Sequence, residues 1–169
     1  MRLIFLAAIL IVTAFPIIIV KAQDAPKRSA ELQVLDRYIG EWETVVTVKD
    51  TGEKLTSIEN RKWSREGKFV LSENFDFLPK REAHFLFTYD SKAKQYRACF
   101  INEEFTVPLL GQWDEIQKTM RWQSSGVAFK HDSVHRFIDN EHSEWTMTVT
   151  SPEGKVVLEL SAKQTRRKK

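Results

Sequence analysis

Hydrophobic and polar residues alternate along most of this chain after Gly40, which is the pattern of β-strands that bury one face. Turn sequences such as Asp50-Thr51-Gly52 and Ser151-Pro152-Glu153-Gly154 interrupt the alternation at short intervals. The pattern predicts ten strands, at residues 42–49, 54–64, 69–77, 84–89, 95–102, 105–113, 119–124, 127–138, 143–150 and 155–166.

Short turns join these strands with no helix between them, which predicts an all-β domain built as an antiparallel meander. A sheet of this size is expected to close into an up-and-down barrel, since closure removes its two exposed edges. A two-layer sandwich is the alternative. We favour the barrel because the regular hairpins leave no long crossover of the Greek-key kind.

A short helix is predicted immediately before the first strand. Leu32, Leu35 and Ile39 recur at spacings of three and four residues, Ser29 suits the N-cap, and Gly40 suits the stop. A helix of about three turns with one hydrophobic side is not stable alone. We therefore expect it to cover one end of the barrel.

The N-terminal 22 residues have a different pattern from the rest. Arg2 precedes an uninterrupted hydrophobic run from Leu3 to Val20, and Val20 and Ala22 are small residues at the positions expected before a cleavage site. This pattern predicts a helical signal peptide at residues 1–22, a linker at 23–28, and one barrel domain at 29–169 that is periplasmic or secreted.

An uncleaved membrane anchor through residues 3–20 is the alternative, because about 18 hydrophobic residues can just span a bilayer. Pro16 and the Val-x-Ala ending favour cleavage. We expect contact with a membrane only if this segment stays attached.

Charge says little about partners. Removing residues 1–22 takes Arg2 and Lys21 from the 26 basic residues and none of the 23 acidic ones, so the net charge falls from +3 to +1. The basic residues 166–169 are interpreted as a solvated tail, and we expect no nucleic-acid binding. Cys99 is the only cysteine, so no intramolecular disulfide can form, and we expect it to be a buried, inert thiol.

Gly40 and Trp42 match a Gly-x-Trp that the calycins carry on their first strand. Those families, which are the lipocalins, fatty-acid-binding proteins and nitrobindins, also place a basic side chain of the last strand over this tryptophan. Arg166 is the matching candidate, because alternation puts it on the same face as Leu158 and Leu160. The chain therefore resembles a calycin, which implies structural roles for Gly40, Trp42 and Arg166 and a cation–π contact between the last two.

More narrowly, the chain resembles a family of exported bacterial proteins known as domain of unknown function 1579. The residues that carry this resemblance are 35–43, Thr88-Tyr89-Asp90, Gly111-Gln112-Trp113-Asp114, Glu144-Trp145-Thr146 and Thr165-Arg166-Arg167. The family implies a fold and no activity. Nitrobindins bind haem through a histidine near the end of the chain, and this sequence has no histidine after His142, so we expect no cofactor.

Strand alternation predicts which polar side chains line the interior. If Trp42 faces inward, the strand at 54–64 presents Glu59 and Arg61 together, and buried charges of this kind require mutual ion pairs or a hydrated ligand cavity. Either reading remains open. The candidate ligand-binding residues are Glu59, Arg61, Trp63, Glu73, Phe75, Phe100, Trp122, His131 and His135.

Metal binding and catalysis have little support. On a strand, His131 and His135 would lie about 13 Å apart, too far to share one ion, so we expect no metal site. No Gly-x-Ser-x-Gly elbow frames a serine, and no glycine-rich phosphate loop is present.

These observations predict an exported, monomeric β-barrel that binds a small, partly apolar or amphipathic ligand inside. One alternative is a barrel with a filled core that acts through its outer surface. Another is a barrel enzyme of the cyclase or isomerase type, for which Glu59 with His131 is the one acid–base pair on offer. We do not expect an enzyme.

Overall fold

The structure is a computed structural model that describes residues 28–73 and 83–168. The predicted signal peptide, nearly all of the predicted linker, and Phe75 lie outside the described residues. Within these two ranges no helix is long and apolar enough to cross a membrane.

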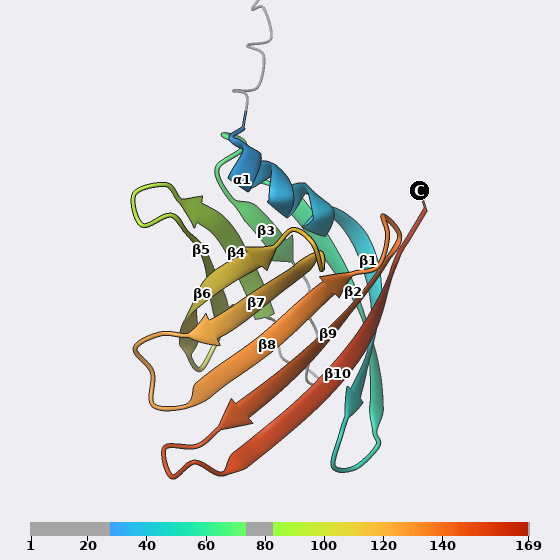
Figure 1. Cartoon of the computed structure of the whole chain (residues 1–169). Helices are drawn as coiled ribbons and strands as arrows, with labels where there is room; N and C mark the ends of the chain where they lie inside the picture. Colours follow the sequence, from blue (N-terminus) through green and yellow to red (C-terminus); the bar gives the residue numbers. More distant parts are fainter. Residues whose placement is uncertain (1–27, 74–82, 169) are drawn as a thin grey trace, which may run out of the picture.

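The predicted helix is present and lies across one end of the barrel (Figure 1). It begins as α1 (Ala30–Val34) and tightens into the 3₁₀ turn η1 (Leu35–Tyr38). The Leu32 amide donates to the Ser29 side chain at 3.4 Å, so Ser29 is the N-cap. Leu35 and Tyr38 are fully buried, and their burial stabilises a helix too short to form alone.

The strands form a closed antiparallel barrel, because β1 pairs with β10 as well as with β2. This confirms the barrel and excludes the sandwich. The ten strands are β1 (Gly40–Val48), β2 (Lys54–Trp63), β3 (Val70–Glu73), β4 (Ala83–Asp90), β5 (Gln95–Asn102), β6 (Thr106–Asp114), β7 (Thr119–Ser124), β8 (Lys130–Phe137), β9 (His142–Thr150) and β10 (Val156–Arg166).

The predicted orientation of Glu73 is wrong. Ser72 pairs with the inward-facing Arg61 and is buried, so its neighbour Glu73 faces outward, where it forms an ion pair with Lys62 at 2.8 Å. Strand pairing with β2 turns Val70 and Ser72 inward, so the other face of β3, with Leu71 and Glu73, is the outer one, and Phe69 just before the strand is 38% exposed. Successive residues of a strand point to opposite faces, so taking the wrong face as the inner one misplaces every side chain of the strand.

Arg166 closes the capped end of the barrel over Trp42, as the calycin resemblance implies. The Arg166 guanidinium carbon lies 4.4 Å from the centroid of the Trp42 ring, and its nitrogens donate to the backbone carbonyls of Arg37, Ile39 and Asn140. Gly40 has a φ of +121°, and a Cβ there would lie 2.6 Å from an Arg166 nitrogen. Glycine is therefore required at this position for both backbone conformation and space.

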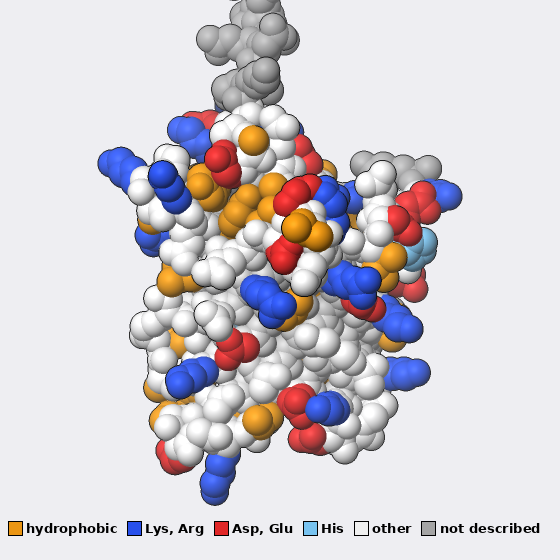
Figure 2. Space-filling view, in the orientation of Figure 1, with side chains coloured by type: hydrophobic (Ala, Val, Ile, Leu, Met, Phe, Trp, Pro, Cys, Tyr) orange, Lys and Arg blue, Asp and Glu red, His pale blue; other side chains and the backbone are white. Residues whose placement is uncertain are grey.

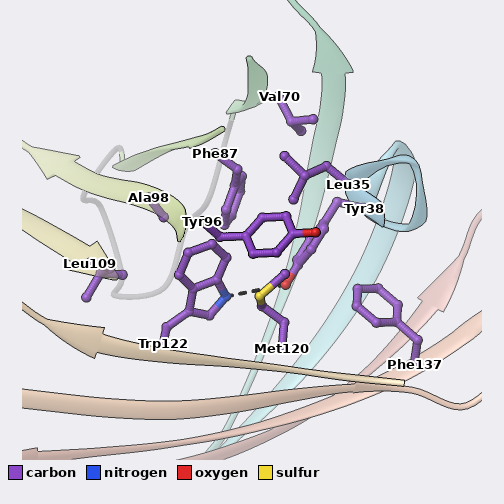
Figure 3. Close-up of a cluster of buried hydrophobic side chains, with 10 residues drawn as sticks. All are labelled: Leu35, Tyr38, Val70, Phe87, Tyr96, Ala98, Leu109, Met120, Trp122 and Phe137. Atoms are coloured by element: carbon purple, nitrogen blue, oxygen red, sulfur yellow. Dashed lines mark hydrogen bonds between the residues drawn. The ribbon is translucent and has the colours of Figure 1, made fainter. Parts of the chain in front are cut away.

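The main hydrophobic core lies under the helix. Figure 3 shows aromatic and aliphatic side chains from the helix and the strands converging there, with Tyr38 at the centre. The Tyr38 ring stacks on Phe87 at 4.9 Å and meets the edge of Phe137 at 4.9 Å, and the Trp122 Nε1–H donates to its hydroxyl at 3.3 Å. This aromatic core fills the capped end.

Candidate ligand-binding interior

A buried ion pair occupies the interior next to this core. Glu59 is 0% and Arg61 5% exposed, and the Arg61 Nη2 donates to Glu59 Oε2. The other Glu59 oxygen accepts from the Thr44 hydroxyl at 2.7 Å and from the Gln164 amide at 3.1 Å. Sequence alternation correctly placed both charged residues inside, and the three strands β10, β1 and β2 bring their partners together.

The hydrogen-bond network continues from Gln164 to His135. The Ser143 hydroxyl donates to Gln164 Oε1 at 3.1 Å, and His135 Nε2 lies 3.0 Å from the same hydroxyl oxygen. A hydroxyl has one proton, so His135 Nε2 must be the donor in this pair, which assigns the tautomer. Burial and the charge of Arg61 lower the pKa of His135 well below its usual value, so the ring is neutral.

Four buried polar atoms around the ion pair have no hydrogen-bond partner among residues 28–73 and 83–168: Nε and Nη1 of Arg61, and the hydroxyl oxygens of Ser57 and Ser72. Ser57 lies opposite Thr44 in the strand pairing, and Ser72 lies opposite Arg61. The Arg61 guanidinium also lies 5.5 Å from the centroid of the Tyr38 ring, which is a cation–π distance. We call this group of Thr44, Ser57, Glu59, Arg61, Ser72, His135, Ser143 and Gln164 the polar layer.

Thr44, Ser143 and Gln164 are not among the ligand-binding residues predicted from the sequence. Each lies on an inward face that alternation can identify, and Gln164 falls between Ala162 and Arg166 on the inward face of β10. Their contacts with Glu59 and with one another depend on strand pairing and cannot be read from composition.

His131 lies apart from this network. Its Nε2 is 2.9 Å from the Ser133 hydroxyl, and burial lowers its pKa to about 4. The contacts of Glu59 lead to Arg61, Thr44 and Gln164, and through Gln164 to His135. The structure therefore shows no contact between Glu59 and His131, the two residues predicted as an acid–base pair.

The aromatic candidates divide between the two ends of the barrel. Trp122 is buried in the aromatic core, and Trp63 donates to Asp36 at 2.7 Å beside the helix, with the Arg28 guanidinium 4.4 Å from its ring centroid. Phe100 is half-buried at the other end, where its ring meets Phe85 at 5.1 Å. Trp63 and Trp122 thus pack the cap, and Phe100 faces the interior near the open end.

We call the end of the barrel away from the helix the open end, because none of the helices within residues 28–73 and 83–168 covers it (Figure 1). Inward-facing side chains there keep part of their surface exposed, although the barrel wall surrounds them. These half-buried inward residues, which we call the open-end residues, are Val48, Leu55, Phe85, Phe100, Val107, Met147, Val149 and Leu158. They give the open end an apolar lining.

One hollow, of about 690 Å³, lies between the helix and Arg166. Another, of about 500 Å³, follows the outer face of β7–β10 and β1 and carries Lys54, Arg121, Arg136 and Lys163. Figure 2 shows this side of the molecule, with separate acidic and basic side chains over the strands and hydrophobic ones gathered below the helix.

Metal and thiol chemistry find no support in the described parts of the chain. No group of three or more His, Cys, Asp or Glu side chains is arranged to hold a metal ion among residues 28–73 and 83–168. Cys99 is half-buried and faces outward, since its neighbours Ala98 and Phe100 face inward. Burial raises the pKa of its thiol, which disfavours the reactive thiolate.

The closed ten-stranded antiparallel barrel, with a helix across one end, is a lipocalin-like fold. A sequence model described as "Protein of unknown function (DUF1579)" matches residues 27–166, so the chain belongs to this family. No curated protein matches the sequence.

Two solved structures share the fold at low identity. The S-type phycobiliprotein lyase CPES from Guillardia theta is similar with a TM-score of 0.59 and 10% identity, over 84% of this chain and 95% of that one. Rv2717c from M. tuberculosis gives a TM-score of 0.57 and 13% identity, over 84% of this chain and 100% of that one. At these identities the likeness concerns the fold alone.

Proposed function

We propose that this protein binds a small, partly apolar ligand inside the barrel, and that the ligand enters through the open end. One observation carries the proposal: most apolar inward-facing side chains near the helix are buried in one core, whereas those at the opposite end keep part of their surface exposed. Small-molecule sites are usually concave and lined with apolar side chains, and the ligand reaches them from one side.

The polar layer supports the same proposal, because it lies between the aromatic core and the open end along β10, β1 and β2. On β1, for example, the inward residues run from Trp42 through Thr44 to Val46 and Val48. A site of this kind offers an apolar wall and a few polar groups that fix the ligand's orientation.

Export is part of the proposal. The hydrophobic run 3–20 and the Val-x-Ala ending favour a protein that works outside the cytoplasm after cleavage behind Ala22. Fractionation of the host and N-terminal sequencing of the mature protein test this part. A chain that keeps residues 1–22 in the membrane fraction would refute cleavage.

Binding is tested by titration with N-phenyl-1-naphthylamine, a neutral apolar probe whose fluorescence rises in apolar surroundings. We expect saturable binding with one site per chain. Leu158→Gln, at the open end, should weaken binding about tenfold, the cost of replacing a buried apolar contact by an amide. Val157→Gln, on the 51% exposed neighbour, is the matched control and should bind as the unaltered protein does.

Absence of saturable binding would favour a filled barrel that acts through its outer surface. Equal affinities of the two variants would show that the probe binds elsewhere. Native mass spectrometry of protein purified from its own host complements the titration, since a resident ligand should co-purify and disappear in Leu158→Gln.

A further inference from the structure

We infer that the outer wall of the barrel carries a second binding site, in which Thr119, Arg121 and Arg136 hold a phosphate group. The site lies in the hollow of about 500 Å³ on the outer face of β7–β10 and β1, which we call the outer hollow. It is separate from the barrel interior, so the inference does not depend on the proposed function.

The first observation is a buried hydroxyl on the outer wall. Thr119 begins β7, and its neighbour Met120 belongs to the aromatic core, so Thr119 faces outward, where it lines the outer hollow. Even so, Thr119 is only 5% exposed, and its hydroxyl oxygen is buried without a hydrogen-bond partner among residues 28–73 and 83–168. Buried polar atoms normally have a partner, so this hydroxyl is suited to donate to a bound acceptor.

Asp114 lies opposite Thr119 on β6, yet it does not act as the acceptor. Its Oδ1 accepts instead from the backbone amides of Ile116 and Gln117, both at 2.9 Å, and so holds the turn between β6 and β7. The Thr119 hydroxyl is thus left for a group that enters the outer hollow.

Two arginines flank this hydroxyl. Arg136 lies directly opposite Thr119 in the pairing of β7 with β8, and Arg121 lies two residues along β7 on the same face. Side chains placed in this way begin about 5 Å and about 7 Å from Thr119, so both guanidinium groups can reach an anion over the hydroxyl. Arg136 also contacts Glu144 at 3.5 Å, but both side chains are exposed, and such a pair contributes little to stability.

The outer hollow has an excess of positive charge. Its charged lining residues are Lys54, Arg121, Arg136 and Lys163, with Glu144 as the one acid. Lys54, Arg121 and Lys163 form no ion pair within residues 28–73 and 83–168. By contrast, three cations elsewhere on the outer wall each pair with an acid: Lys49 with Glu159, Lys62 with Glu73, and Arg97 with Asp90. Unpaired cations gathered around a buried hydroxyl favour an anionic ligand.

The arrangement of the donors favours a phosphate group over a planar carboxylate. Thr119 donates from the floor of the outer hollow, whereas the two guanidinium groups approach from its sides. A tetrahedral phosphate presents oxygens in several directions at once, and guanidinium groups match pairs of them. Thr47, Thr146 and Ser161 also line the outer hollow, so a larger molecule that carries the phosphate would meet hydroxyl groups there and should be polar.

Isothermal titration calorimetry with inorganic phosphate and with glucose 6-phosphate tests the site. Both titrations are run in about 0.15 M salt, which screens attraction to exposed charges beyond about 8 Å. We expect saturable binding with one site per chain. Tighter binding of glucose 6-phosphate would assign the group to a larger polar molecule, and tighter binding of inorganic phosphate would assign it to the free ion; either result supports the site. Acetate, a planar carboxylate, should bind at least about tenfold more weakly than phosphate.

Substitutions locate the binding. Thr119→Val removes the hydroxyl at nearly unchanged shape and should weaken phosphate binding about tenfold, since a hydrogen bond to a charged group is lost. Thr119→Ser keeps the hydroxyl and should keep most of the affinity. Arg121→Met should weaken binding by about tenfold or more. Arg65→Met, on an exposed arginine in the turn between β2 and β3, is the matched control and should bind as the unaltered protein does.

Three results would overturn the inference: no saturable binding of either phosphate probe, equal affinities of Thr119→Val and the unaltered protein, or acetate binding as tightly as phosphate. Circular dichroism verifies that each variant is folded. If Thr119→Val does not fold, the comparison of Arg121→Met with Arg65→Met still decides. Binding of N-phenyl-1-naphthylamine should be the same in all these variants, so failure of either proposal leaves the other standing.

Discussion

The two ends of this barrel are built from the same alternating strands, yet they differ in how completely they bury their inward side chains. At the capped end Trp42, Leu35 and Met120 are 0% exposed, because the helix adds Leu35 and Tyr38 to what the strands supply. At the open end Val46 and Leu160 form a smaller core, and Met147 and Leu158 around it remain half-exposed. Stability is concentrated where the helix closes the barrel, and accessible apolar surface is left where it does not.

The two ends should differ most in how far the deletion of a side chain lowers the free energy of unfolding. Trp42→Ala should lower the free energy of unfolding by about 3–5 kcal/mol, since it removes a fully buried aromatic ring together with its contacts to Arg166 and Tyr38. Met147→Ala, at the half-exposed open end, should cost about 1 kcal/mol. Urea denaturation of both variants measures the difference. Similar losses would mean that the two ends are equally packed.

Adding a single carbon should also be costly at the capped end. A Cβ at Gly111 would lie 2.4 Å from the ring of Trp122, which faces it on the neighbouring strand. Gly111→Ala should therefore destabilise by about 1–3 kcal/mol, the usual range for overpacking. The loss should shrink in a Trp122→Phe background, because a smaller ring leaves room. A double-mutant cycle by denaturation provides the measurement, and zero coupling would show that the ring is not the obstacle.

Acidification should weaken the fold gradually, through one histidine near each end. The unfolded chain binds protons on His131 and His135 near pH 6.5, whereas burial lowers the pKa of His131 to about 4 and that of His135 well below 6.5 in the barrel. These two histidines therefore leave the free energy of unfolding unchanged above about pH 6.5. Below that pH each one lowers it by up to about 1.4 kcal/mol per pH unit.

Denaturation midpoints between pH 7.5 and pH 5 measure this dependence. His135→Gln and His131→Gln should each flatten the decline by a similar amount, because burial lowers both pKa values in the barrel, so that the proton uptake of the unfolded chain sets the slope over this range. An unchanged decline in the variant that combines both substitutions would show that other groups control it.

Much of the fold was predictable from local pattern. The helix before Gly40, the ten strands and the Trp42–Arg166 contact follow from period, turn residues and the calycin resemblance, and the structure confirms them. Alternation also placed Glu59, Arg61 and His135 inside correctly. It failed for Glu73, because the face with Phe69 and Leu71 looks like the apolar one, whereas pairing with β2 turns the Val70 and Ser72 face inward.

The candidate site was less predictable than the fold. Alternation shows that Trp63, Phe100 and Trp122 face inward, but it does not show at which end of a tilted barrel each one lies. Only Phe100 is at the open end, whereas the other two pack the cap. Two partners of Glu59 come from positions 15 and 105 residues away in the chain: the β1–β2 hairpin brings Thr44, and the closure of β10 on β1 brings Gln164.

The sequence by itself determined the elements, the closure of the sheet, and the inward orientation of Glu59, Arg61 and Arg166, because these depend on period 2 and on local turn residues. The tertiary structure decided which end is filled and which is open, and how Arg61, Glu59 and His135 are connected. The physical reason is that strand register and helix placement bring together residues distant in the chain, and burial and unpaired hydrogen-bonding groups are properties of that assembly.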